Sequence, residues 1–516
     1  MSFFYSLSDS VNSFIAAWVG QEFWLTRFVF LRALGFIYFI AFLSLLQQFK
    51  PLFGANGLLP AQLYLERVAQ GGGSLFSLFW KLPSIFWFHI SDHFMMVCAC
   101  VGVLLSAAVM LGLSNGCSML VLWLIYMSFV HVGQVFFGYG WESLLLETGF
   151  LAIFLYPFFN LSFFPAHHPP PKLVLLLITW VLFRNMFGSG LIKIRGSECW
   201  RDLSCLFYHF ETQPLPNPLS PYLHHLPKWM LKVGVFFNHF VELIVPFGLF
   251  LTAPLRIFSG FLTALFQFFL IISGNLSFLN WLTLVTCIPS FDDRVWRPLF
   301  PQWMLSKIPE VSMVSTTHFL TQLPYWILGI SIGFLSINPI KNFFSQNQAM
   351  NRSYDPFHLV NSYGAFGHVG MKRFECVIKG ADNLQSNHWI EYDFKAKPGE
   401  PTRSHPIIAP YHYRLDWQIW FAAMGSYQHN PWLVHFVYKL LHNDAASLGL
   451  IQPSPFKDKA PRYIKIDLYE YKFPQKGYRG SLKWDRRFIK SYLPPLSADN
   501  PSLIDYIRAN GWKLYD

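Results

Sequence analysis

Charged side chains inside long apolar stretches are the residues of this sequence that point most directly to chemistry. An ionisable group at bilayer depth costs at least about 2.5 kcal/mol and is usually paired or lines a cavity. Glu142 and Glu147 lie in one apolar stretch, and Arg184 lies in the next. We expect Glu142 to sit at a helix start, where the helix dipole favours a carboxylate, and Glu147 to pair with Arg184.

Lys193 lies one turn beyond an apolar helix, after the small residues Gly188, Ser189 and Gly190. A desolvated lysine can act as a general base. A lysine at a helix end can also extend its ammonium group to the lipid headgroups, and the spacing favours this second interpretation.

His239 and Glu242 are three residues apart and therefore share one face of a predicted helix. Such a pair can belong to a metal site in a helical bundle, but no further carboxylates are spaced to complete it. We therefore favour a hydrogen-bonded structural pair, and we read Asn275 and Asn280 as polar contacts between helices.

The polar second half of the chain carries His405, His412, Arg414 and Asp416 close together. They show no nucleophile elbow of a Ser-His-Asp hydrolase, and the chain has no phosphate-binding loop, dinucleotide-binding glycines or paired-cysteine zinc site. His388 and Asp393 have the spacing of an acyltransferase H-x4-D motif. They lie in a strand pattern, so we attribute the match to chance. The sequence predicts neither a metal nor a cofactor.

The elements that must position these residues are mostly membrane-spanning helices. Hydrophobic residues make up 53% of the 516 residues and charged residues only 13%, against about 25% charged in soluble globular chains. This excludes an ordinary cytosolic enzyme, a disordered protein and a coiled coil. Spans of about 20 apolar residues are expected, eight or nine in number because 257–290 is either one span or two, at 28–46, 94–113, 118–137, 143–162, 173–190, 230–252, 257–273, 275–290 and 319–337.

The pattern changes after Asn338. Apolar and polar residues alternate in 373–379, 389–395 and 463–471, which predicts half-buried strands, while helices are expected at 415–424 and 432–441. The predicted fold class is a polytopic α-helical membrane bundle of 8–9 spans over 1–337, followed over 338–516 by a soluble, mainly β, sandwich-like domain with helical insertions.

Positive charge is concentrated in the second part, which has 23 Lys+Arg against 15 Asp+Glu, while residues 1–337 have 16 against 13. This excess suits an acidic protein client or a lipid headgroup surface. The basic residues are scattered among acids and no nucleic-acid-binding motif is present, so we exclude nucleic acid as the partner.

Two of the seven cysteines, Cys199 and Cys205, lie in a polar loop, whereas most of the others lie in apolar stretches. They can pair if the loop faces an oxidising compartment, but their spacing leaves this open. Residues 1–27 lack the basic start and cleavage site of a signal peptide, so we expect 28–46 to act as an uncleaved insertion signal.

Several long strings of the sequence resemble the lipase maturation factor family. Shorter strings at Asn280–Thr283 and Asp292-Asp293 fit as well. The long strings are Trp141–Phe150, Gly190–His209, Glu211–Pro218, Tyr411–Trp417, Trp420–Ala423 and Tyr471–Phe473.

The resemblance implies a multipass protein without established catalytic activity that assists the folding and assembly of secreted homodimeric lipases and other disulfide-containing clients. It implies the endoplasmic reticulum membrane in a eukaryote, or the inner or plasma membrane in a bacterium, with the C-terminal domain on the non-cytosolic side binding the client. Candidate client-binding residues from the matching strings are Tyr411, His412, Arg414, Asp416, Trp417 and Trp420.

The membrane part is also similar to the membrane domain of vitamin K-dependent γ-carboxylase. In that enzyme a lysine after a small-residue helix end deprotonates the hydroquinone, and Lys193 stands at the matching place. The carboxylase's second lysine position is Ile192 here.

Two functions are therefore expected, and the first is a membrane-bound maturation factor that is not an enzyme. The alternative is a membrane enzyme acting on a quinone or lipid-like substrate, with Lys193 as the base. Its cavity would be lined by an intramembrane polar cluster of Glu142, Glu147, Arg184, Lys193, His239 and Glu242.

Overall fold

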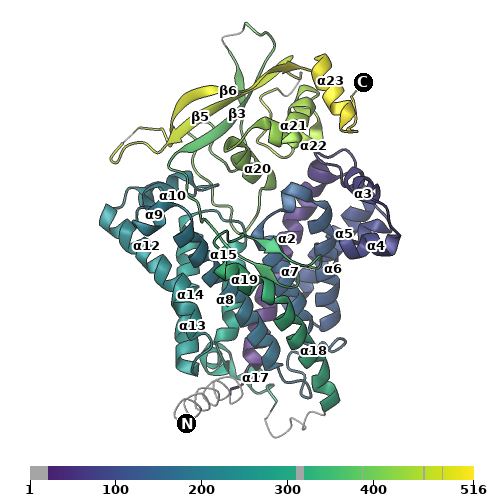
Figure 1. The fold of residues 1–516 in the computed structure, drawn as a ribbon, viewed down its shortest axis with the longest axis vertical. Coiled ribbons are helices and arrows are strands. Elements are labelled where there is room, and N and C mark those ends of the chain that lie inside the picture. The colour runs from purple at the N-terminus through teal and green to yellow at the C-terminus, as the bar shows by residue number, and fades with distance from the viewer. Residues whose placement is uncertain (1–20, 310–318, 386–387, 457–458, 479, 516) are drawn as a thin grey trace.

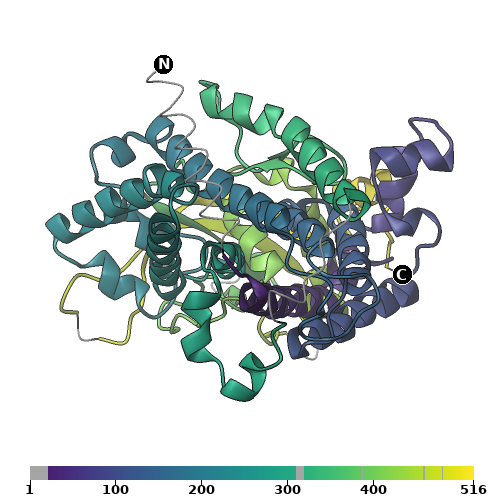
Figure 2. The same ribbon diagram turned by 90° about the horizontal axis from the view of Figure 1, so that it is seen from below.

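The computed structural model describes residues 21–309, 319–385, 388–456, 459–478 and 480–515. It has two parts that follow one another along the longest axis of the molecule, a body of helices below and a sheet with short helices above (Figure 1). Figure 2, seen from below, shows the helices in front of the sheet.

The helical body is that of a multi-pass membrane protein, as predicted. Six helical segments within the described residues are long and apolar enough to cross a membrane, while the helices at the three remaining predicted spans are shorter, so the count of eight or nine spans stays a prediction. The long segments are α2 (Trp24–Phe53), α5 (Asp92–Leu111), α8 (Lys172–Arg195), α12 (Lys228–Leu243) with α13 (Val245–Gly248), α14 (Ala253–Ser273), and α18 (Phe319–Leu335) with α19 (Ile337–Phe344); the shorter helices are α6 (Gly116–Val132), α7 (Gly140–Ile153) and α15 (Leu279–Cys287).

Residues 257–290, which the sequence predicts as one span or two, contain a break between α14 and α15. Helix α14 ends at Ser273 before Gly274, and α15 begins only at Leu279. Asn275 lies in the break, where its side-chain oxygen accepts hydrogen bonds from the backbone N–H groups of Ile408 and Ala409. The chain therefore forms two helices here, and a segment of the C-terminal part occupies the gap between them.

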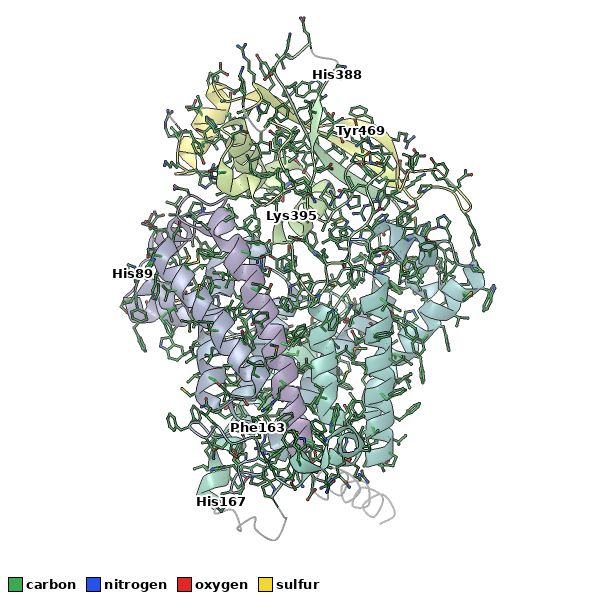
Figure 3. The ribbon with its side chains drawn as sticks, turned by 180° about the vertical axis from the view of Figure 1, so that it is seen from behind. His89, Phe163, His167, His388, Lys395 and Tyr469 are labelled. Atoms are coloured by element: carbon green, nitrogen blue, oxygen red, sulfur yellow. A yellow bond between two sulfur atoms is a disulfide. The ribbon has the colours of Figure 1, made fainter. Side chains whose placement is uncertain are left out.

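Short helices connect the long ones at both ends of the body. Figure 3 shows Phe163 and His167 at the end far from the sheet, and His388 and Tyr469 at the sheet end. The connecting helices are α3 (Ala61–Ala69), α4 (Leu75–Lys81), α9 (Glu198–Arg201), α10 (Leu206–Thr212), α11 (Ser220–His224), α16 (Asp293–Trp296) and α17 (Gln302–Leu305).

The C-terminal part is built on one antiparallel sheet with the strand order β4-β3-β5-β6. Its strands are β3 (Arg373–Ala381), β4 (Ile390–Tyr392), β5 (Tyr463–Lys472) and β6 (Asp485–Ser497). Cys376 of β3 faces Leu468 of β5 in the register. A separate two-stranded ladder, β1 (Arg352–Ser353) with β2 (Asn361–Ser362), lies nearer the helical body.

The predicted sheet in the C-terminal part is confirmed, but the sandwich-like detail needs correction. Within the described residues, the layer packed on the four-stranded sheet is helical: α20 contacts β3 and α21 contacts β5. Helix α21 is buried along nearly its whole length, so it fills the space that a second sheet would occupy. The helices of this part are α20 (Arg414–Ala423), α21 (Pro431–Leu441), α22 (Ala445–Leu448) and α23 (Pro501–Ala509).

One cluster of buried apolar side chains runs from the helical body into the C-terminal part. It includes Phe30 and Tyr38 of α2 as well as Ile466 of β5 and Phe436 of α21. Because burial of apolar surface is the main favourable term in folding, the two parts stabilise each other across this shared core.

Candidate functional site

Glu147 of α7 is confirmed as the partner of Arg184 of α8, and both side chains are buried. The second carboxylate oxygen of Glu147 accepts hydrogen bonds from the Asn361 side chain at 2.9 Å and from the Tyr363 hydroxyl at 2.6 Å. Arg184 also donates to the Asn361 carbonyl at 2.5 Å. A buried ion pair needs such additional hydrogen bonds to offset its loss of hydration, so this site holds the chain near β2 against the body.

Glu142 lies in the first turn of α7, as expected. Its carboxylate is paired across the molecule, since Arg414 at the start of α20 donates to it at 2.7 Å and the Tyr126 hydroxyl donates to its other oxygen. Arg414 also donates to the Phe136 carbonyl at 2.8 Å and stacks on the Phe137 ring at 3.5 Å from its centroid. Glu142 and Arg414 therefore form the charged centre of the junction between the two parts.

The residues around Arg414 build this junction rather than an open surface. The His412 carbonyl accepts from Gln48 at 2.7 Å, and the Trp417 ring lies 4.9 Å from that of Trp141. Asp416 accepts from the backbone N–H of Ala396 at 2.6 Å. Burial raises the pKa of Asp416, and its hydrogen bonds from the backbone N–H groups of Lys397 and Ala396 oppose that rise.

The expectation that this string binds clients meets a physical obstacle. His412, Arg414, Asp416 and Trp417 are all buried, while Tyr411 and Trp420 are only partly exposed. Burial, with a smaller contribution from the charge of Arg414, lowers the pKa of His412 well below its usual value. Buried side chains offer little surface to a partner, so we assign the string to joining the two parts.

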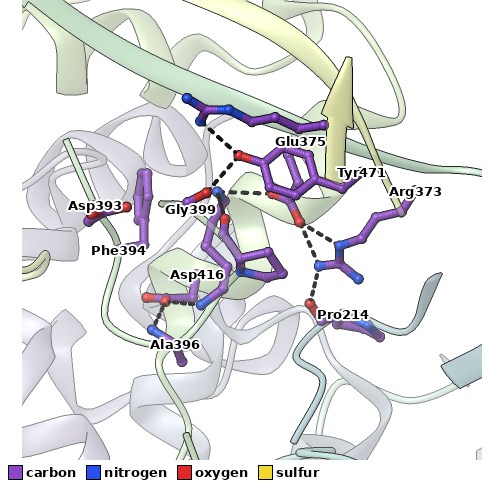
Figure 4. Close-up of polar contacts among 12 residues, drawn as sticks. Pro214, Arg373, Glu375, Asp393, Phe394, Ala396, Gly399, Asp416 and Tyr471 are labelled. Carbon is purple, nitrogen blue, oxygen red and sulfur yellow. Dashed lines mark hydrogen bonds and ion pairs between the residues drawn. The ribbon is translucent and has the colours of Figure 1, made fainter. Parts of the chain in front are cut away.

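A second junction lies between β3 and the loop that follows α10 (Figure 4). Arg373 donates to the Pro214 carbonyl at 2.9 Å and to Glu375 at 2.8 Å. The other oxygen of Glu375 lies 2.9 Å from the Lys397 ammonium. Tyr471 donates to the Gly399 carbonyl at 2.8 Å, which closes the cluster.

Lys193 does not extend to a headgroup surface but lies buried in a three-residue network. Its ammonium donates to Glu242 at 2.6 Å and to Asn238 at 3.0 Å, and Asn238 donates to the other Glu242 oxygen at 2.7 Å. The predicted His239–Glu242 pair does not form, because His239 contacts the Trp200 carbonyl at 2.9 Å instead.

The Lys193 network lies on the wall of a cavity of about 480 Å³ between α8, α12, α14 and α15. The cavity reaches the outer face of the body between α12 and α14, where Val233 and Phe269 are exposed. His209 and Asn280 also line it; both are more than nine-tenths buried, and their side chains form no hydrogen bond with another described residue. An apolar cavity with such unpartnered groups suits a ligand with an apolar body and a polar end.

The six residues expected to line one cavity are thus distributed over separate places. Glu142 and Glu147 each bind a different segment of the C-terminal part, and only Lys193 and Glu242 line the cavity. Among the described residues, no group of three or more His, Cys, Asp or Glu is close enough to hold a metal ion.

Cys199 and Cys205 are joined by a disulfide and are buried. The loop that they close packs against the C-terminal part: Trp200 donates to the Phe366 carbonyl at 2.9 Å, and Ser197 donates to the Gly367 carbonyl at 3.0 Å. The disulfide and the C-terminal part therefore lie on the same side of the helical body.

Sequence reasoning missed several residues of these sites, namely Asn238, His209, Asn361 and Tyr363. Asn238 carried a usable signal, because it lies four residues before Glu242 and so shares its helix face. The others carried none, since they meet their partners only through the tertiary fold.

Comparison with known proteins gives two family matches. Residues 25–298 match the model described as the lipase maturation factor transmembrane domain, and residues 359–494 match that of the lipase maturation factor C-terminal domain. No solved structure matches the chain.

The chain is similar over nearly its whole length to curated proteins. It is 42% identical to lipase maturation factor 1 of Homo sapiens over 520 residues, which cover 95% of this chain and 91% of that protein. The mouse protein, from Mus musculus, is 42% identical, with 95% and 90% covered. Lipase maturation factor 2 of Xenopus laevis is 31% identical, with 95% and 85% covered.

Proposed function

The chain belongs to the lipase maturation factor family, and from this premise we propose that it is a membrane-bound factor that assists the folding and assembly of secreted lipases or other secretory clients. The role in lipase maturation comes from the name of its relatives, the lipase maturation factors. The way in which it acts, by holding incompletely folded clients on its C-terminal part, is our proposal. Such binding is modest and reversible, because flexible segments lose entropy when they bind.

The observation that carries the proposal is the firm junction between the two parts. The Glu142–Arg414 pair, the Glu147 site and the Arg373 cluster all bind the C-terminal part to the helical body through buried polar contacts. The sheet lies at one end of the molecule, and the helical body extends from it to the opposite end (Figure 1). A client that meets this sheet would be held close to a membrane surface at a fixed orientation.

The Cys199–Cys205 disulfide supports a non-cytosolic position for the C-terminal part. Disulfides persist in oxidising compartments such as the lumen of the endoplasmic reticulum or the periplasm. Because the disulfide loop packs against Phe366 and Gly367, we infer that the C-terminal part lies in the same compartment as the disulfide. We propose the endoplasmic reticulum membrane in a eukaryotic cell and the inner or plasma membrane in a bacterium.

The direct test is rescue of lipase secretion in cells that lack their own maturation factor. We expect the full chain to restore secreted lipase activity without a change in lipase synthesis. A well-expressed, membrane-inserted chain that leaves the secreted activity at the level of the deficient cells would contradict the proposal for lipases.

A second candidate function rests on the cavity at Lys193. Its apolar walls, its opening between α12 and α14 and the unpartnered His209 and Asn280 favour a quinone or lipid-like ligand. Lys193 would act as the base only after releasing Glu242, which now holds it at 2.6 Å.

The test of this second function is the double variant Lys193→Met/Glu242→Gln, which removes the base without leaving a lone buried charge. The enzyme hypothesis expects lost client maturation or lost turnover of an added quinone. The matched variant Arg195→Met removes a cation on the same helix outside the cavity. If the double variant and the control both mature clients normally, and no quinone turnover depends on Lys193, the enzyme hypothesis fails.

A further inference from the structure

Strand β6 forms an open edge of the C-terminal sheet. It is last in the order β4-β3-β5-β6 and pairs with β5 alone. Across the described part of the chain, no backbone hydrogen bond reaches its other edge between Arg486 and Leu493. Such an edge presents a row of N–H and C=O groups with which an extended segment can pair.

The open edge is accessible along most of its length. Residues 487–491 are exposed, and the apolar side chains of Phe488 and Ile489 are 54% and 37% exposed. Pro494 and Pro495 follow, and proline cannot donate to a new ladder. At about 3.3 Å per residue, the stretch before these prolines can accept an extended segment of six to nine residues, roughly 20–30 Å long.

The surroundings of the edge are strongly basic. Residues 472–490 contain seven Lys+Arg and one acidic residue. Arg487 reaches Glu470 at 2.6 Å, whereas Lys483 and Lys490 are exposed and have no ion-pair partner among the residues that the structure describes. Lysines on an edge discourage pairing between identical strands, so the edge repels a second copy of this chain and favours a segment of opposite charge.

We propose that the outer edge of β6 binds an extended, acidic segment of a client protein, which adds a strand to the sheet. This inference rests on the proposed function and names the surface through which it works. The row of unpaired backbone groups favours a protein segment over a lipid headgroup, because a headgroup offers no matching ladder. The sheet also lies at the end of the molecule opposite the lower end of the helices (Figure 1).

The experiment uses the full chain in detergent and measures fluorescence anisotropy with two short probe peptides. One peptide alternates glutamate with valine, and the other alternates lysine with valine. We expect the acidic peptide to bind and the basic peptide not to bind. The variant Arg487→Glu/Lys490→Glu should weaken binding of the acidic peptide by about tenfold or more, since like charges now face each other.

The matched control is Arg508→Glu/Lys513→Glu. It makes the same charge change in the same part of the chain, and it also removes one ion-paired arginine, since Arg508 pairs with the exposed Asp505 as Arg487 pairs with the buried Glu470. Its affinity for the acidic peptide should stay within about twofold of the original.

Three results would overturn the inference: no binding of the acidic peptide by the unsubstituted chain, unchanged binding by Arg487→Glu/Lys490→Glu, or an equal loss in the control variant. None of them touches the proposed function, which stands or falls on rescue of lipase secretion by the unsubstituted chain. If rescue succeeds and the peptide result is negative, clients are held by another surface.

Discussion

Glu142 of α7 and Arg414 of α20 lie 2.7 Å apart, although 272 residues separate them in the sequence. Both side chains are fully buried. One helix of the membrane body and the first residue of a helix in the C-terminal part thus share a charge pair. The pair therefore fixes the position of the C-terminal part relative to the helical body.

Removing one partner of this pair should strongly destabilise the protein. We expect Arg414→Met to cost about 3–5 kcal/mol, because it leaves the Glu142 carboxylate buried without a cation. The thermal unfolding midpoint in detergent measures this loss. The double variant Arg414→Met/Glu142→Gln should recover part of it.

Arg508→Met is the control for that measurement, because the Arg508–Asp505 pair is exposed and exposed pairs contribute at most about 1 kcal/mol. If Arg414→Met and Arg508→Met lower the midpoint equally, the buried pair has no special role.

The Tyr363 hydroxyl should contribute to stability through its hydrogen bond to Glu147. Tyr363→Phe should cost about 1.5–3 kcal/mol, since hydrogen bonds to charged groups are stronger than neutral ones. Tyr354→Phe removes a hydroxyl that contacts Ser362 at 2.9 Å, and this neutral contact should cost only about 0.5–1.5 kcal/mol. Chemical denaturation of the two variants gives the comparison, and the reverse ranking would be evidence against the Glu147 site.

The disulfide predicts a simple count of reactive thiols. After denaturation without a reductant, maleimide should label the five free cysteines, and after reduction it should label all seven. Cys199→Ser/Cys205→Ser should give five under both conditions. Mass spectrometry of the labelled chain provides the count, and seven labels without a reductant would disprove the disulfide.

Acidification should weaken the C-terminal part through His405. Burial, followed by the charges of Arg373, Lys483 and Arg403, lowers the pKa of His405 to about 4, against about 6.5 for an exposed histidine. As the pH falls below about 6.5, the unfolded chain therefore gains a proton that the folded chain does not take up until about pH 4, so stability falls across this interval.

The variant His405→Gln tests this dependence, because it should make the fall of the unfolding midpoint with pH shallower between about pH 7 and about pH 4. His224, whose pKa burial also lowers to about 4, would account for part of the slope that remains. Identical slopes for the variant and the original chain would show that His405 is not the group responsible.

The local pattern of the sequence was enough to predict the helices and the central strands. Glu147 and Arg184 are opposite charges in neighbouring apolar stretches, which made their pairing predictable. Arg414 is different, because its partner lies 272 residues away and only the tertiary fold brings the two together.

Strand β6 was missed for a physical reason. Its residues are exposed on both faces over much of its length, so no alternation of apolar and polar residues marks it, and Pro494 and Pro495 argue against a central strand. The prediction of a sandwich was wrong for a related reason. The alternating patterns of β3 and β5 predict strands with one buried face, but they do not specify whether helices or a second sheet cover that face.

The measurement that tests the account most directly is protease treatment of sealed membrane vesicles with an epitope tag after Asp516. We predict that the tag and the sheet survive in intact microsomes and are digested once detergent opens them. Digestion of the tag in intact vesicles, with a lumenal marker protein still protected, would put the C-terminal part in the cytosol, where it cannot meet secreted clients.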